Sequence, residues 1–248
     1  MGQEQDFPEP KEKRAIAFFD GQNLYRHAKT AFGHHYPNYD PLKLHAAVCK
    51  EKGWQPSAVR FYTGIPDPEI NRFWHGYWVR RLLGMSRTNI HVTSLPLDYR
   101  TENAVLLDGA TIIFPDDRQV IIPEDSDTTL PNNSGIAFFD NVKKTRHIAK
   151  ETGIDIRLAL DAVRLVRQRK YDVAIFFSQD QDFAQAIEEI KDIAQEQKRW
   201  IKLACAFPHG PSASIKKGIR GCEPFRMNEA FYNACLDLRD YRSRNRRQ

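Results

Sequence analysis

Two continuous apolar runs constrain the fold of this chain more than any other feature. Residues Ala15 to Phe19 and Val173 to Phe177 contain no polar side chain. Runs this short and this apolar are typical of strands buried on both faces of a sheet, which occur mainly in parallel sheets covered by helices. The runs therefore predict an α/β fold, with a mostly parallel central sheet in a three-layer α/β/α arrangement.

Helical and strand patterns alternate along much of the remaining chain. The segment 41–52 has helical spacing, with Asp40 as a candidate N-cap and Gly53 as its stop. Apolar residues at 111–114 and 120–122 flank a turn and predict an inserted β-hairpin. The same patterns predict helices over 24–32, 66–84, 138–150, 155–169 and 183–197, and strands over 58–62, 90–93 and 200–207.

These elements predict one domain over residues 15–235, with an insertion at about 96–135. Residues 1–14 form a flexible lead, and residues 236–248 form a basic tail. The chain has 37 Lys and Arg against 32 Asp and Glu, and its net charge is +5. This excess suits a polyanionic partner, although a basic tail is also typical of a solvated chain end.

The sequence favours a cytoplasmic protein. Its four cysteines include no C-x-x-C pair, so neither a zinc site nor a disulfide framework is indicated. The first residues lack the apolar segment of a signal peptide. Because no stretch approaches the roughly 20 apolar residues of a membrane span, we expect no membrane partner. A homo-oligomer is left open.

Aspartates follow both buried runs. Asp20 comes directly after the first run, and Asp180 and Asp182 come shortly after the second. The carboxyl ends of parallel strands are where such sheets bind ligands. Capping of the next helix explains one carboxylate at each place, but not a pair. Carboxylates gathered there repel one another unless a hard divalent cation lies between them, so we expect Mg²⁺ or Mn²⁺.

Two further polar residues have more than one interpretation. Asp161 interrupts an apolar helical face, so its charge requires a partner: either the acidic site or an ion pair with Arg157, one turn away. Asn23 is either a polar residue in the first turn of a helix or a group that orients Asp20 or a metal-bound water. Lys216, Lys217 and Arg220 are candidate phosphate contacts near the end of the sheet.

Three motifs, taken together, resemble the NYN-domain proteins of the LabA-like group. They are F-F-D-G-Q-N-L-Y at 18–25, G-I-D at 153–155 followed by Asp161, and S-Q-D-Q-D-F at 178–183. The resemblance covers about residues 15–225. It departs from the family pattern at Gln179 and Gln181, where Gly and Ser are usual, and at Glu223, where Asp is usual.

The resemblance implies a PIN-like fold and metal-dependent hydrolysis of phosphodiester bonds in RNA. The catalytic and metal-binding cluster that it implies is Asp20, Asp161, Asp180 and Asp182. Asn23 joins the catalytic set, and Ser178 and Asp155 lie close around it. In this scheme Asp20 and Asp180 hold the cation, while Asp161 or Asp182 orients the attacking water.

Other classes of function fit the sequence less well. A non-catalytic PIN-like protein that binds RNA or a protein partner is the second hypothesis, but every acidic position is retained. Gln22 stands where an Asp-x-Asp phosphatase motif would need its second aspartate. A Gly-rich phosphate loop is absent, which argues against P-loop nucleotide hydrolysis. DNA as a substrate stays open.

Overall fold

The structure is a computed structural model, and the residues it describes exclude several segments. It describes residues 7–103, 105–107, 111–113, 119–121, 129–132, 135–140, 145–150, 153–213 and 217–242. The chain divides into two compact units. The first comprises Met1–Thr63, Leu82–Ser94 and Gly153–Asp240, and the second comprises Gly64–Arg81, Leu95–Thr152 and Tyr241–Gln248.

The largest sheet among the described residues has six strands in the order β13-β12-β11-β1-β2-β3. At its centre, β1 (Arg14–Asp20) pairs in parallel with β11 (Val173–Phe177) and with β2 (Gln55–Ile65). Next to them, β12 (Lys202–Pro208) pairs in parallel with β11 and with β13 (Glu223–Met227). The other edge strand is β3 (Ile90–Pro96). The predicted mostly parallel sheet is confirmed.

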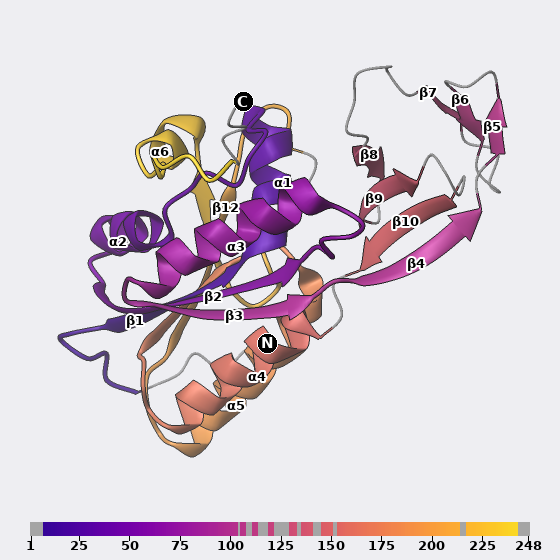
Figure 1. Cartoon of the computed structure of the whole chain (residues 1–248). Coiled ribbons are helices and arrows are strands. Elements are labelled where there is room, and N and C mark those ends of the chain that lie inside the picture. The colour runs from indigo at the N-terminus through magenta and orange to yellow at the C-terminus, as the bar shows by residue number, and fades with distance from the viewer. Residues whose placement is uncertain are drawn as a thin grey trace. The chain divides into compact units, whose positions relative to one another are not determined.

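Helices cover both faces of the sheet in the first unit. Figure 1 shows α1 (Gly21–Phe32) and α2 (Pro41–Lys52) on one face, and α4 (Ile154–Arg167) and α5 (Ala184–Glu196) on the other. Helix α2 begins and ends as its sequence predicts, because Asp40 caps it and Gly53 ends it in the left-handed conformation. The three-layer α/β/α arrangement is therefore confirmed.

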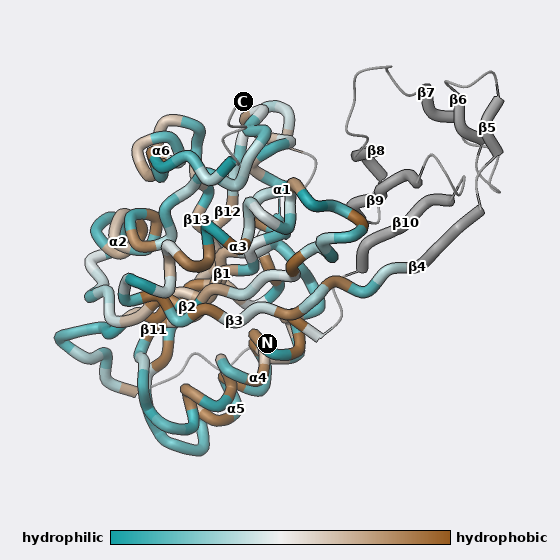
Figure 2. Tube along the Cα trace, in the orientation of Figure 1, coloured by the Kyte–Doolittle hydropathy of each residue, from teal (hydrophilic) through white to brown (hydrophobic). Residues whose placement is uncertain are grey.

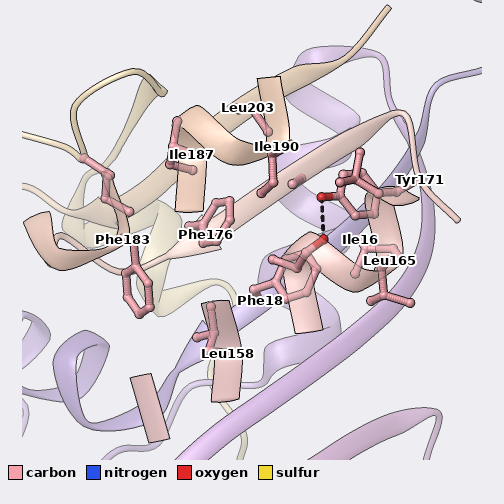
Figure 3. Packing of buried hydrophobic residues seen from close by; sticks show 14 of the residues in the cluster. Ile16, Phe18, Leu158, Leu165, Tyr171, Phe176, Phe183, Ile187, Ile190 and Leu203 are labelled. Atoms are coloured by element: carbon pink, nitrogen blue, oxygen red, sulfur yellow. Dashed lines mark hydrogen bonds between the residues drawn. The ribbon is translucent and has the colours of Figure 1, made fainter. Parts of the chain in front are cut away.

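The two apolar strands are buried on both faces, which explains why they lack polar residues. Toward α4 and α5, Phe18 stacks on Phe176 with ring centroids 5.4 Å apart (Figure 3). At the edge of this cluster, the Tyr171 hydroxyl donates to the Ala162 carbonyl at 2.9 Å. On the opposite face, Phe19 stacks on Phe177 at 4.0 Å. Figure 2 shows hydrophobic and hydrophilic residues alternating along α4 and α5, as expected of helices with one buried face.

The second unit contains the inserted strands. The predicted hairpin is confirmed as β6 (Thr111–Ile113) and β7 (Gln119–Ile121), which pair antiparallel, and β5 (Val105–Leu107) pairs with β6. A second antiparallel sheet has the order β4-β10-β9-β8. Its strands are β4 (Asp98–Asn103), β8 (Thr129–Asn132), β9 (Gly135–Asp140) and β10 (Thr145–Lys150). The insertion is thus larger than a single hairpin.

Three local predictions were wrong. The predicted helix over 138–150 is replaced by β9 and β10; β10 has antiparallel partners on both sides, so sheet hydrogen bonds outweigh the helical spacing. Helix α3 (Arg72–Ser86) begins at residue 72, not 66, because the Asn71 side chain accepts the Trp74 N–H and caps it there. Strand β13 was missed, since Pro224 argues against a strand except at a sheet edge, where β13 lies.

The remaining elements are short. The single turn η1 (Gln181–Phe183) precedes α5, and α6 (Glu229–Asn233) follows β13. No helix within the described ranges is long and apolar enough to cross a membrane. In the tail, Arg239 pairs with Asp237, and residues 243–248 lie outside the described residues. The domain boundaries at 15 and 235 stay predictions.

The two leucines of α4 provide a matched test of the core. Leu158 is fully buried, whereas Leu160, on the same helix, is 59% exposed. We expect Leu158→Ala to lower the free energy of unfolding by about 2–5 kcal/mol, because it leaves a cavity. Leu160→Ala should change it by about 0.5 kcal/mol or less. Urea unfolding measures both, and equal losses would contradict the described packing.

Candidate active site

Asp20 is a buried carboxylate at the carboxyl end of β1. Its side chain lies beside the turn after β11, because the register of the two strands pairs Phe19 with Phe177. Asp20 is 2% exposed. One carboxylate oxygen accepts the Asn23 N–H at 3.0 Å, and the other accepts the Ser178 hydroxyl at 3.2 Å. Asp20 therefore caps α1 and also links β1 to the turn that carries Asp180.

The turn after β11 is fixed by a chain of short contacts. The Asn23 side-chain oxygen accepts the Gln179 N–H at 3.0 Å. The Asp180 N–H donates to the Ser178 hydroxyl at 3.1 Å, and the Asp180 carboxylate accepts the Asp182 N–H at 3.0 Å. Asp180 thus caps η1. The structure brings together Asp20, Asn23, Ser178 and the turn with both later aspartates.

Asp155, in the first turn of α4, interacts with these aspartates through its charge. Burial and, to a smaller extent, the negative charge of Asp155 raise the pKa of Asp20 to about 7, although the Asn23 N–H, Arg26 and the Ser178 hydroxyl act in the opposite direction. Burial also raises the pKa of Asp155, with added contributions from the charges of Asp180 and Asp182. Asp20, Asp155, Asp180 and Asp182, which we call the aspartate cluster, therefore interact as one set of charges.

Asp161 is engaged in a different network. It is 3% exposed, and its carboxylate accepts the Tyr62 hydroxyl at 2.8 Å. The guanidinium of Arg164 lies 2.7 Å from it, and that of Arg60 lies 3.5 Å from it. Burial and the bond to Asp161 raise the pKa of Tyr62. These contacts favour the ion-pair interpretation of Asp161, with Arg164 and Arg60 closer than Arg157, which is at 4.0 Å.

Two residues of the site, Arg26 and His27, were not predicted from the sequence. Arg26 on α1 lowers the pKa of both Asp20 and Asp155, so its positive charge lies near both carboxylates. Burial and the charge of Arg26 lower the pKa of His27, and the charge of Asp180 offsets part of this shift, so His27 lies near Asp180. Asn23, Arg26 and His27 have the i, i+3, i+4 spacing of one helical face. That spacing, starting from Asn23, was the signal available in the sequence.

The predicted basic contacts are only partly described. Lys216 lies outside the described residues, whereas Lys217 and Arg220 are exposed side chains near the turn after β11. Glu223 accepts from Lys52 at 2.5 Å and pairs with Lys202 at 2.6 Å. These lysines lower the pKa of Glu223. Glu223, on β13, is therefore engaged in ion pairs with lysines of α2 and β12.

The aspartate cluster offers only carboxylate oxygens, which are the ligands that a hard divalent cation prefers. Within the described part of the chain, no three His, Cys, Asp or Glu side chains form a ready-made metal-binding group. Burial nevertheless raises the pKa of Asp20 and of Asp155, and neighbouring negative charge adds to both shifts: that of Asp155 on Asp20, and those of Asp180 and Asp182 on Asp155. A divalent cation with oxygen ligands relieves that repulsion, and Mg²⁺ and Mn²⁺ both prefer carboxylates.

One family model agrees with the second and third of these motifs. The family model described as "NYN domain" matches residues 117–214, a span that includes Asp155, Asp180 and Asp182. A solved structure of a protein of unknown function from Vibrio parahaemolyticus is similar, with a TM-score of 0.46 and 15% identity. That similarity covers 90% of this chain and 98% of the other. Comparison with curated proteins gives no match.

The raised pKa of Asp20 predicts how the stability of the metal-free protein depends on pH. An aspartate in the unfolded chain has a pKa of about 3.9, whereas Asp20 in the folded protein has a pKa of about 7. The folded state therefore holds this proton more tightly, so its contribution to stability is complete below pH ~4 and is lost as pH rises through about 7.

Asp20→Asn should remove this dependence and make the metal-free protein more stable than wild type at pH 8. Urea unfolding between pH 4 and 8, with EDTA present, measures the effect. Asp192→Asn, on the exposed surface of α5, is the matched control and should follow wild type. A steeper loss of stability in Asp20→Asn than in wild type would contradict the account.

Proposed function

We propose that this chain, an NYN-domain protein of the PIN-like nuclease superfamily, is a metal-dependent endoribonuclease that hydrolyses phosphodiester bonds of single-stranded or structured RNA. The observation that carries the proposal is the aspartate cluster at the carboxyl end of β1 and β11. A buried carboxylate with a raised pKa beside three further aspartates is costly for folding, so this arrangement favours a catalytic role. The assignment to the LabA-like group stays a prediction.

Asp20, Asp180 and Asp182 are the proposed ligands of Mg²⁺ or Mn²⁺, and Asp155 joins them at the same site. A bound divalent cation supplies neutralising charge for the scissile phosphate and makes water acidic enough to attack near neutral pH. Asp155 is the proposed base that accepts a proton from the attacking water, because burial and the charges of Asp180 and Asp182 raise its pKa and so make it a stronger base than a solvated aspartate.

Arg26, Asn23 and Ser178 have supporting roles in the proposal. Arg26 places a guanidinium charge near Asp20 and Asp155, where it can contact an oxygen of the phosphate group. Asn23 and Ser178 position the carboxylates, since both bond to the segments that carry them. For Asp161 we propose a positioning role instead of metal binding: its contacts with Tyr62 and Arg60 hold α4, and hence Asp155, against β2.

Cleavage of labelled RNA by wild type and Asp180→Asn tests the proposal. The substrates are a single-stranded RNA and a DNA of matched sequence, each with Mg²⁺, with Mn²⁺ and with EDTA. We expect wild type to cut RNA only with metal, and Asp180→Asn to lose roughly 100-fold or more of that rate, because the change removes charge from the cluster at nearly constant shape.

Asp192→Asn is again the control, because it makes the same substitution on the exposed surface of α5, and it should keep the wild-type rate. Equal binding of RNA by wild type and Asp180→Asn, with no cleavage by either, would overturn the proposal in favour of a non-catalytic RNA-binding protein. Cutting of DNA at the RNA rate would make the protein a general nuclease.

A further inference from the structure

The segment Lys217–Arg220 is tied by side chains to the turn that carries Asp180 and Asp182. The Gln179 side-chain amide donates to the Lys217 carbonyl at 2.9 Å. The Gln181 amide donates to the Gly218 carbonyl at 3.0 Å, and its oxygen accepts the Arg220 N–H at 3.1 Å. Both glutamines are immediate neighbours of Asp180 in the sequence. The segment is therefore held one glutamine side chain away from residues 179 and 181, which flank Asp180.

The same segment is also held from the side of the sheet. Ile219 is 2% exposed and belongs to the main hydrophobic cluster. A Cβ atom at Gly218 would lie 2.3 Å from the sulfur of Cys205, so only glycine allows this approach to β12. The Cys222 N–H donates to the Ile219 carbonyl at 3.2 Å and closes a turn. These contacts fix the backbone before any ligand binds, which reduces the entropic cost of binding.

Lys217 and Arg220 flank the buried Ile219, and both side chains are exposed. Among the described residues, neither is within ion-pair distance of a carboxylate, unlike Arg60 and Arg164, which pair with Asp161. Two cations on a fixed backbone beside a group of aspartates are placed to attract a polyanion that the aspartates would otherwise repel. Phosphate groups of a nucleic-acid backbone are ligands of this kind.

We propose that Lys217 and Arg220 bind backbone phosphates of the RNA next to the scissile one, and that Gln179 and Gln181 are positioning residues for this site. The inference rests on the proposed function, because it takes RNA as the substrate. The NYN pattern that this chain resembles usually has Gly and Ser at the positions of Gln179 and Gln181. Neither of those side chains carries an amide that could reach the 217–220 backbone. The site is thus built by residues particular to this chain.

Salt dependence of RNA binding tests the phosphate contacts. The probe is a fluorescent single-stranded RNA, measured by anisotropy with EDTA so that no cleavage occurs. For the double variant Lys217→Ala/Arg220→Ala, we expect the slope of log affinity against log salt to fall by about 1.4, which is two contacts at about 0.7 each. An unchanged slope would overturn the proposal.

The matched control removes the same charge elsewhere. Lys50, in the last turn of α2, and Lys170, shortly before β11, are exposed and precede the amino ends of β2 and β11, away from the aspartate cluster. Lys50→Ala/Lys170→Ala should leave the slope as in wild type. If it lowers the slope equally, net charge and not a built site accounts for binding, and the proposal fails.

A double-mutant cycle tests the role of Gln181, whose exposed side chain can be removed with little risk to folding. Gln181→Ala should weaken RNA binding in the wild-type background, because Arg220 is then no longer held in position for its phosphate contact. It should have little further effect in Arg220→Ala, where that phosphate contact is already lost. Additive losses would contradict a positioning role. Circular dichroism confirms that each variant folds.

Steady-state cleavage with Mg²⁺ separates this inference from the proposed function. Lys217→Ala/Arg220→Ala should raise KM more than it lowers kcat, because these phosphate contacts bind the ground state and the transition state about equally. If no protein cleaves RNA but the salt slopes change as expected, the proposed function fails and the phosphate site stands. If wild type cleaves RNA and the double variant keeps its KM and its salt slope, the phosphate site fails and the proposed function stands.

Discussion

The site depends on one carboxylate, that of Asp20, which is held out of water at the end of the central strand. Burial destabilises its charge, and the nearby charge of Asp155 adds to the effect. The Asn23 N–H and the Ser178 hydroxyl offset part of this cost. The Asn23 N–H reaches Asp20 as a local cap of α1, whereas the Ser178 hydroxyl reaches it because β1 and β11 are parallel neighbours in this register. The sheet topology and the chemistry of the site are therefore linked through a single side chain.

The central sheet could be predicted from sequence because its strands are short, apolar and buried on both faces. Phe18 stacks on Phe176 on one face of the sheet and Phe19 stacks on Phe177 on the other, so a polar side chain in either strand would be buried. The helix predicted over 138–150 was wrong because its residues form β9 and β10 instead. The pairing of β10 with β4 depends on residues distant in sequence, which helical spacing does not reveal.

The site was predicted in part for the same reason. Asp20, Asp180 and Asp182 follow predicted strand ends, so their convergence follows from the topology. The choice between Asp155 and Asp161 on α4 depends on Arg60 and Tyr62, which β2 supplies. No local pattern shows that these two residues face Asp161. The sequence alone therefore left both interpretations of Asp161 open, and the contacts favour the ion pair.

The central claim is that Asp155, and not Asp161, joins Asp20 and Asp180 around a divalent cation. Calorimetric titration of wild type, Asp155→Asn and Asp161→Asn with Mn²⁺ tests it directly. The account predicts that wild type binds Mn²⁺, that Asp155→Asn binds it about 10-fold or more weakly, and that Asp161→Asn is less stable but keeps the wild-type affinity. Loss of affinity in Asp161→Asn with full affinity in Asp155→Asn would contradict it, as would the absence of binding by wild type.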